Sequence, residues 1–181
     1  MGQRFSFSAH EEQSDPPAQP AALDGWILST VGRAVVVAML HQEGAESASF
    51  AHLAEALARY AAFRVGVERL SPGADLRASV RKIVSLAPDI VLLCDELHLN
   101  YQPDNAWSVR ALRMADEEGM HLLTFVALVG TGIERNAARR MGFEYGFDLG
   151  QDPSCIARVL AREAAAREAA RRYGSSPPCY L

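Results

Sequence analysis

The sequence predicts an α/β domain with a doubly wound, five-stranded parallel sheet. Three observations lead to this fold class. The 181 residues are 49% apolar, which supports one compact core rather than two. From residue 33 onward, short β-branched runs alternate with longer segments of helical period, the pattern of a parallel sheet wrapped by helices. Several of these runs are continuously apolar, as in strands covered on both faces.

The strands are expected where these apolar runs occur. The first four runs are strong, and the fifth is weaker. The predicted strands are residues 34–40, 64–68, 89–93, 122–129 and 145–148.

The segments after the strands carry apolar residues at three- and four-residue spacing, which predicts helices. Pro88 ends the second helix, because the residue before a proline is pushed out of the helical region. Asp152 and Pro153 are typical of a helix start, and Gly174 of a helix end. The predicted helices are residues 45–61, 74–87, 104–119, 132–141 and 152–173.

The two ends of the chain depart from this pattern. Residues 1–25 are rich in Ser, Gln, Glu, Pro and Ala and are expected to be a flexible polar tail. The apolar segment Trp26-Ile27-Leu28 is expected to pack, as a helix or loop, on an α/β domain of residues 26–162. Residues 163–181 are expected to be a helical extension and C-terminal tail, because their helical part is almost wholly Ala, Arg and Glu. We expect this extension to leave the domain, as a solvated helical end or as a docking surface.

Charge and composition exclude several partners. The net charge is −4, most of it in the first 25 residues, and Lys82 is the one lysine, so neither nucleic acid nor an anionic membrane is an expected partner. No apolar run approaches the length of about 20 residues that spans a bilayer, and no export signal is visible. Cys94, Cys155 and Cys179 are far apart, which favours reduced thiols in a cytoplasm.

Ligands of open parallel sheets bind outside the carboxyl ends of the strands, which directs attention to four turns. The turn Gly130-Thr131-Gly132 joins a buried strand to a helix, so its backbone N–H groups could approach an anionic group. A tight turn between strand and helix explains the same glycines equally well. The glycine-rich patterns of P-loop and dinucleotide-binding proteins are absent.

Other polar residues follow the first and third predicted strands. His41, three residues before Gly44, could bind a metal or move a proton, or be a loop histidine without such a role. Asp95 and Glu96, with His98 beside them, could bind Mg²⁺ or act as acid and base, although a solvated turn has the same composition.

Residues 33–161 resemble the cobalamin-binding domains of adenosylcobalamin-dependent mutases and methyltransferases. The resemblance rests on the segments 129–132, 141–150 (Met-Gly-Phe-Glu-Tyr-Gly-Phe-Asp-Leu-Gly) and 88–93, and is closest to the small subunit of the lysine and ornithine aminomutases. It implies a flavodoxin-like sheet that binds cobalamin and acts with a partner subunit or as a homo-oligomer, as an accessory subunit of an isomerase. The implied cofactor-binding residues are His41, Gly44, Ser47, Cys94, Glu96, Gly130, Thr131, Gly132, Phe147 and Gly150.

The chain departs from this family at its D-x-H-x-x-G signature, whose histidine binds cobalt from below. Ala45, Ser47 and Phe50 stand in the positions of its Asp, His and Gly. His41 could serve as the metal ligand if the loop shifts its register. The family's Ser-x-Leu/Thr segment, which lines the nucleotide tail, falls on Cys94 and Glu96. Cobalamin that keeps its own benzimidazole, another tetrapyrrole, or loss of the cofactor all remain open.

Two other functions compete with this one. The first is a receiver-like domain used for protein interaction or regulation, because the segment 88–95 resembles the third strand of a receiver. Phosphotransfer is not expected of it, because the first strand lacks the acidic pair that binds Mg²⁺ and Lys82 falls inside a predicted helix. An independent small enzyme ranks last, because no nucleophile, base and orienting group come together in the sequence.

Overall fold

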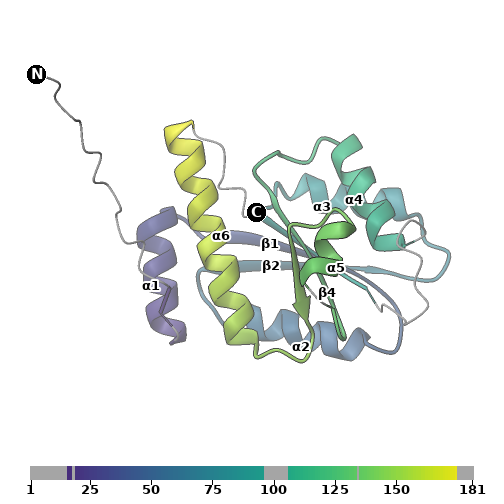
Figure 1. Cartoon of the computed structure of the whole chain (residues 1–181), viewed down its shortest axis with the longest axis horizontal. Helices are drawn as coiled ribbons and strands as arrows, with labels where there is room; N and C mark the ends of the chain where they lie inside the picture. The colour runs from purple at the N-terminus through teal and green to yellow at the C-terminus, as the bar shows by residue number, and fades with distance from the viewer. Residues whose placement is uncertain (1–15, 18, 96–105, 134, 175–181) are drawn as a thin grey trace, which may run out of the picture.

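The computed structural model describes residues 16–17, 19–95, 106–133 and 135–174. Within these ranges five strands form one sheet in the order β2-β1-β3-β4-β5, and every neighbouring pair is parallel. Helices cover both faces of the sheet (Figure 1), so the predicted fold class is confirmed. The strand order reverses between β1 and β3, which is where such sheets bind ligands. The strands are β1 (Val35–Gln42), β2 (Phe63–Leu70), β3 (Ile90–Cys94), β4 (Phe125–Gly130) and β5 (Tyr145–Asp148).

Two hydrophobic layers hold the helices against the sheet. One layer joins α1, α2 and α6 to residues such as Val37 and Met39, and the other joins α3, α4 and α5 to residues such as Ala38 and Leu40. Neighbouring residues of β1 therefore point to opposite faces, as the pleat of a strand requires. The helices are α1 (Pro20–Val31), α2 (Ser47–Ala58), α3 (Leu76–Ser85), α4 (Trp107–Glu117), α5 (Arg135–Arg140) and α6 (Pro153–Tyr173).

The chain is ordered earlier than the predicted boundary at residue 25. Helix α1 begins at Pro20, and Leu23 and Ile27 are fully buried against the sheet and α6. The Asp24 carboxylate accepts hydrogen bonds of 3.0 and 2.9 Å from the N–H groups of Ala61 and Ala62. The expected tail is thus wrong for residues 20–25, because an apolar stripe of α1 completes the core. The expected packing of Trp26-Ile27-Leu28 is confirmed, whereas residues 1–15 lie outside the described residues.

The second half of α6 belongs to the core, so the predicted departure of this helix from the domain is wrong. Ala164, Ala165 and Ala170 are buried, because the small alanine side chain lets the helix approach the sheet and α1 closely. Arg167 is also buried: its guanidinium donates to Glu163 at 2.6 Å and to Glu144, and lies 4.8 Å from the ring centre of Phe125.

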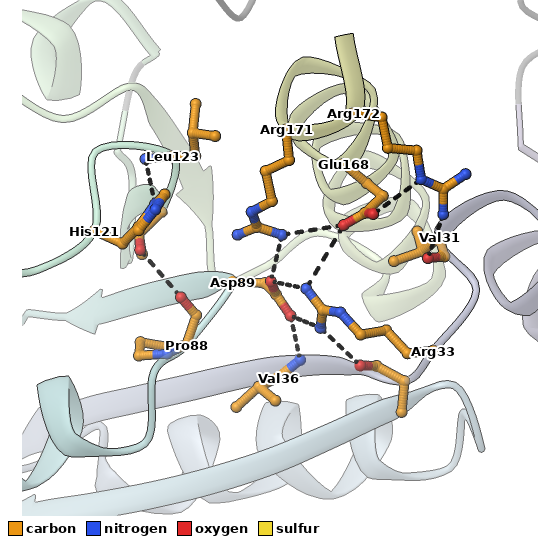
Figure 2. A network of polar contacts seen from close by, with 12 residues as sticks. Val31, Arg33, Val36, Pro88, Asp89, His121, Leu123, Glu168, Arg171 and Arg172 are labelled. Carbon is orange, nitrogen blue, oxygen red and sulfur yellow. Dashed lines mark hydrogen bonds and ion pairs between the residues drawn. The ribbon is translucent and has the colours of Figure 1, made fainter. Parts of the chain in front are cut away.

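Polar contacts fix the end of the same helix at the amino edge of the sheet (Figure 2). Arg171 donates to Asp89, which directly precedes β3, and Arg172 donates to the carbonyl oxygen of Val31 at the end of α1, each at 3.0 Å. Helices α1 and α6 therefore lie side by side (Figure 1).

Candidate functional site

A groove of about 550 Å³ opens at the carboxyl edge of the sheet. One wall is the first half of α2, which follows β1, and the other is formed by the turns after β4 and β5 and the start of α6. The groove thus lies where doubly wound sheets bind their ligands. Its lining residues are Ala48, Ser49, His52, Leu53, Thr131, Asp148, Leu149, Gly150, Gln151 and Pro153.

Helix α2 forms its wall through its helical period. Phe50 and Leu57 point into the core and are fully buried, so residues on the other side of the helix face outward. Ala48 and Ser49 are small and leave space, while the exposed imidazole of His52 stands at the groove as a group that can both donate and accept a hydrogen bond.

Asp148 joins the two turns of the opposite wall. Its Oδ2 accepts a hydrogen bond of 3.0 Å from the N–H of Gly132, and its Oδ1 accepts one of 2.7 Å from the N–H of Gly150. Gly132 has a φ of +68°, a conformation that L side chains rarely adopt. The anion site predicted at this glycine turn is therefore already occupied by the side-chain carboxylate of Asp148.

Gly130 has a packing role within the domain. It is buried, and a Cβ at this position would collide with the carbonyl oxygen of Asp95 and lie 2.8 Å from Cδ1 of Ile133. The third strand passes too close for any side chain here. The small residue at position 130 was expected to let a ligand approach the backbone. In the structure, the backbone of Asp95 occupies that place instead.

The turn after β1 reaches across the edge of the sheet. Glu46, which directly precedes α2, accepts a hydrogen bond from the hydroxyl of Thr131 after β4. Ser47 stays within its own turn, since its Oγ accepts a 2.9 Å hydrogen bond from the N–H of Gly44. Gly44, Ser47 and Thr131 therefore lie at the carboxyl edge, and Thr131 also lines the groove.

His41 lies in the core instead of in a loop. Strand β1 continues to Gln42, two residues past the predicted end at residue 40, so His41 follows the alternation of the strand and faces α2. Its ring is 1% exposed, its centre lies 5.8 Å from that of Phe50, and Nδ1 is 3.2 Å from the carbonyl oxygen of Gln42. This placement separates His41 from the groove and from any cobalt ion held at the edge.

Two more of the expected binding residues are core residues. Cys94 and Phe147 are each 1% exposed, and both belong to the layer under α2 and α6. Burial raises the pKa of the Cys94 thiol far above its usual range, and the neighbouring Asp95 raises it further. Cys94 is therefore a protonated thiol that stabilises the core. Glu96 lies outside the described residues, as does His98.

The features that suggested a receiver domain have structural roles. Asp95 is buried, and its carboxylate accepts a 2.5 Å hydrogen bond from the hydroxyl of Ser108 on α4. Lys82 on α3 pairs with Glu68 of β2 at 2.8 Å. Neither Asp95 nor Lys82 is among the described lining residues of the groove.

Sequence reasoning missed His52 and the double contact of Asp148. The helical register could have indicated His52, because positions 48 and 52 lie on the side of the helix away from the buried positions 50 and 57. The place of Asp148 after the fifth strand marks it as an edge residue, but the two amides that it joins become neighbours only in the folded sheet.

The groove offers hydrogen bonds without strong positive charge. Ser49, Thr131 and Gln151 provide hydroxyl and amide groups, and among the described lining residues there is no lysine or arginine. In the part of the chain that the structure describes, no three His, Cys, Asp or Glu side chains come together as a metal site. None of the described helices is long and apolar enough to cross a membrane. The site is suited to holding a mostly neutral ligand with polar substituents.

No protein-family model matches the chain, and no curated protein matches it. Among solved structures, it is similar to the 1.5 Å crystal structure of a novel cobalamin-binding protein from Desulfitobacterium hafniense DCB-2. The TM-score is 0.53 at 18% sequence identity, and the match covers 80% of this chain and 65% of that protein, so the chain spans slightly less than two thirds of its neighbour's length. At this identity the likeness concerns the fold alone. The chain therefore has an α/β fold like that of a cobalamin-binding protein.

Proposed function

We propose that this chain is a cobalamin-binding module that acts with a partner protein, and that the partner is the catalytic subunit of a radical mutase-type enzyme. The observation that carries the proposal is the groove at the carboxyl edge, whose described lining offers hydroxyl and amide groups and no lysine or arginine, in a sheet whose fold is shared with a cobalamin-binding protein. The resemblance of the segments 129–132 and 141–150 to cobalamin-binding domains points to the same edge.

The groove residues fit the periphery of a corrinoid. The corrin ring carries neutral amide side chains, which need hydrogen-bond donors and acceptors of the kind that Ser49, Thr131 and Gln151 supply. Ala48 and Gly150 add little bulk to the lining of the groove. When bound, the cofactor would supply a cobalt–carbon bond that can be broken to give a radical.

The residues do not fit cobalt ligation by His41, which is buried under α2. Ser47, in the family's histidine position, is engaged with Gly44. We therefore expect the corrinoid to keep its own benzimidazole on cobalt or to take the exposed imidazole of His52, the histidine that lines the groove.

The size of the groove supports the need for a partner. A volume of about 550 Å³ is too small to enclose a whole cobalamin, so much of the cofactor would remain uncovered. A second protein or a second copy of this chain can cover the exposed part of the cofactor and exclude solvent from it.

An absorbance spectrum tests the cofactor. The purified protein is incubated with hydroxocobalamin, adenosylcobalamin or haem, desalted, and compared with an Ala48→Trp variant, whose indole fills the groove, and with Ala58→Trp, an exposed position on the same helix. We expect cobalamin to stay with the parent and with Ala58→Trp, and to be lost from Ala48→Trp. A parent protein that retains no corrinoid, or that retains haem instead, contradicts the proposal.

Sedimentation of the cobalamin-loaded protein tests the partner. We expect the loaded chain to self-associate, or to bind a separate protein that covers the groove, more strongly than the cofactor-free chain. The Ala48→Trp variant serves as the control that cannot be loaded. Equal sedimentation with and without cobalamin, together with equal binding of any candidate subunit, contradicts the role of a partner.

A further inference from the structure

The turns after β4 and β5 each direct a backbone N–H group toward the same side chain, that of Asp148. Asp148 is the last residue of β5, and its two carboxylate oxygens accept from Gly132 in the turn after β4, at 3.0 Å, and from Gly150 in the turn after β5, at 2.7 Å. The N–H of Leu149 also donates to the carbonyl oxygen of Gly130 at 3.0 Å. One carboxylate thus closes a cradle made of two main-chain donors.

Backbone amides in turns of this kind are a common way for proteins to bind phosphate groups of a ligand. Here both donors are directed at the oxygens of Asp148, which is covalently tethered and therefore always present at the cradle. An incoming phosphate would have to displace this carboxylate and then lie beside its negative charge, which is unfavourable in a partly enclosed site.

The rest of the lining gives a phosphate little compensation. None of the described lining residues is lysine or arginine. We infer that Asp148 is the specificity-determining residue of the groove: it occupies the amide cradle as a resident anion, keeps phosphate groups out of the cradle, and leaves the rest of the groove to neutral groups of a ligand. The inference rests on the proposed function only in the identity of the ligand, which is taken to be a corrinoid with neutral amide side chains.

The test uses inorganic phosphate as the probe and the amide resonances of Gly132 and Gly150 as the readout. In the parent protein these resonances should not move when phosphate is added. In Asp148→Ala, which frees both donors, they should shift in a saturable way, with an apparent affinity for phosphate at least about tenfold above that of the parent. Formate, a carboxylate of minimal size, should compete with phosphate in this variant.

Two further variants keep the test decisive. Glu55→Ala removes an exposed carboxylate of α2 that does not line the groove, and this variant should behave as the parent does. Asp148→Asn keeps the shape of the side chain but removes its charge, so it should also gain phosphate binding. It replaces Asp148→Ala in the test if that variant fails to fold. Parent amides that respond to phosphate as strongly as those of the variants overturn the inference, as do folded Asp148 variants that respond to neither anion.

The result is separable from the proposed function. Loss of cobalamin binding by the parent would defeat the corrinoid proposal and leave the anion titration unchanged. Conversely, a parent that binds cobalamin while Asp148→Ala gains no affinity for phosphate would retain the proposed function and defeat the role assigned to Asp148.

Discussion

The carboxylate of Asp89 and the guanidinium of Arg171 are joined by a 3.0 Å hydrogen bond across 82 residues of sequence. Asp89 also accepts two hydrogen bonds of 2.7 Å from Arg33 and one of 3.0 Å from the N–H of Val36 (Figure 2). This cluster connects the starts of β1 and β3 with the end of α6, at the edge of the sheet opposite the groove. This polar cluster and the candidate groove thus lie at opposite edges of the sheet.

The first prediction concerns this cluster. Asp89→Asn should lower the free energy of unfolding by about 2 kcal/mol, because it weakens charged hydrogen bonds to a side chain that is 6% exposed. Urea unfolding followed by circular dichroism measures the change. Glu117→Gln is the control, since Glu117 pairs with Arg77 at the surface and its loss should cost at most about 0.5 kcal/mol. Equal effects of the two substitutions would contradict the importance of the cluster.

The same carboxyl group should make stability depend on pH. Burial raises the pKa of Asp89, but the hydrogen bonds from Arg33 and Val36 outweigh burial and leave its pKa below the usual value. Its contribution should therefore be complete above the unfolded-state pKa of about 3.9 and be lost as the pH falls from there through the folded-state pKa. Melting temperatures from pH 7 to pH 2.5 should fall less steeply at the acid end in Asp89→Asn than in the parent. Parallel acid limbs would show that other carboxyl groups govern this range.

Removal of residues 163–181 should unfold the domain or greatly lower its melting temperature. The truncation uncovers α1 and removes Arg171 from Asp89, together with buried residues such as Ala164 and Ala170. Far-ultraviolet circular dichroism during heating measures the effect. Tyr173→Ala is the control, because this side chain is 81% exposed and its loss should move the melting temperature by no more than about 1 °C. A truncated chain that melts as the parent does would mean that this half of α6 is dispensable.

The two histidines near α2 should have opposite phenotypes. His41→Ala should lower stability by about 2 kcal/mol, because it leaves a cavity beside Phe50, while the spectrum of bound cobalamin stays the same. His52→Ala should leave the melting temperature unchanged and weaken cobalamin retention, because His52 lines the groove. Thermal melting and the spectrum after desalting separate the two effects. A changed cobalamin spectrum in His41→Ala would identify His41 as a cobalt ligand after all.

The cysteines should differ in reactivity. The thiol of Cys94 is 1% exposed and has a pKa that burial raises, so it should resist iodoacetamide until the protein is unfolded. Cys155, on the exposed face of α6, should be alkylated in the native protein. Mass spectrometry of the peptides before and after urea treatment measures both rates. Native alkylation of Cys94 at the rate of Cys155 would show that β3 opens readily.

The sheet was predictable because β1, β3 and β4 contain continuous apolar runs, which identify these strands without knowledge of their neighbours. The helix at residues 152–173 was also predicted, but the packing of α1 and of the second half of α6 was not. Leu23 and Ile27 of α1 are buried by contacts that include α6, and the alanines of α6 are buried partly by α1. Alanine suits both a solvated helix and a closely packed one. The burial of both helices therefore depends on a long-range contact between them, which local sequence patterns do not reveal.

The candidate site was predictable as a place and only partly as a set of residues. The carboxyl-edge rule located the turns of Gly44, Thr131 and Gly150, all of which lie at that edge. The same rule could not predict which way the side chains near the end of a strand point. Because β1 is two residues longer than predicted, His41 belongs to the strand and points into the core. Cys94 is enclosed for the same reason, as the final residue of β3.

The pairing of α1 with α6 also affects how the protein is made. Arg172 bonds to Val31 across 141 residues, so the helix that is synthesised first receives its cover only when the last described helix has left the ribosome. Until then the apolar stripe of Leu23, Ile27 and Val31 is available to other proteins, including chaperones. The buried core is therefore complete only once α6 has formed, even though each β-α-β unit can begin to form on the growing chain.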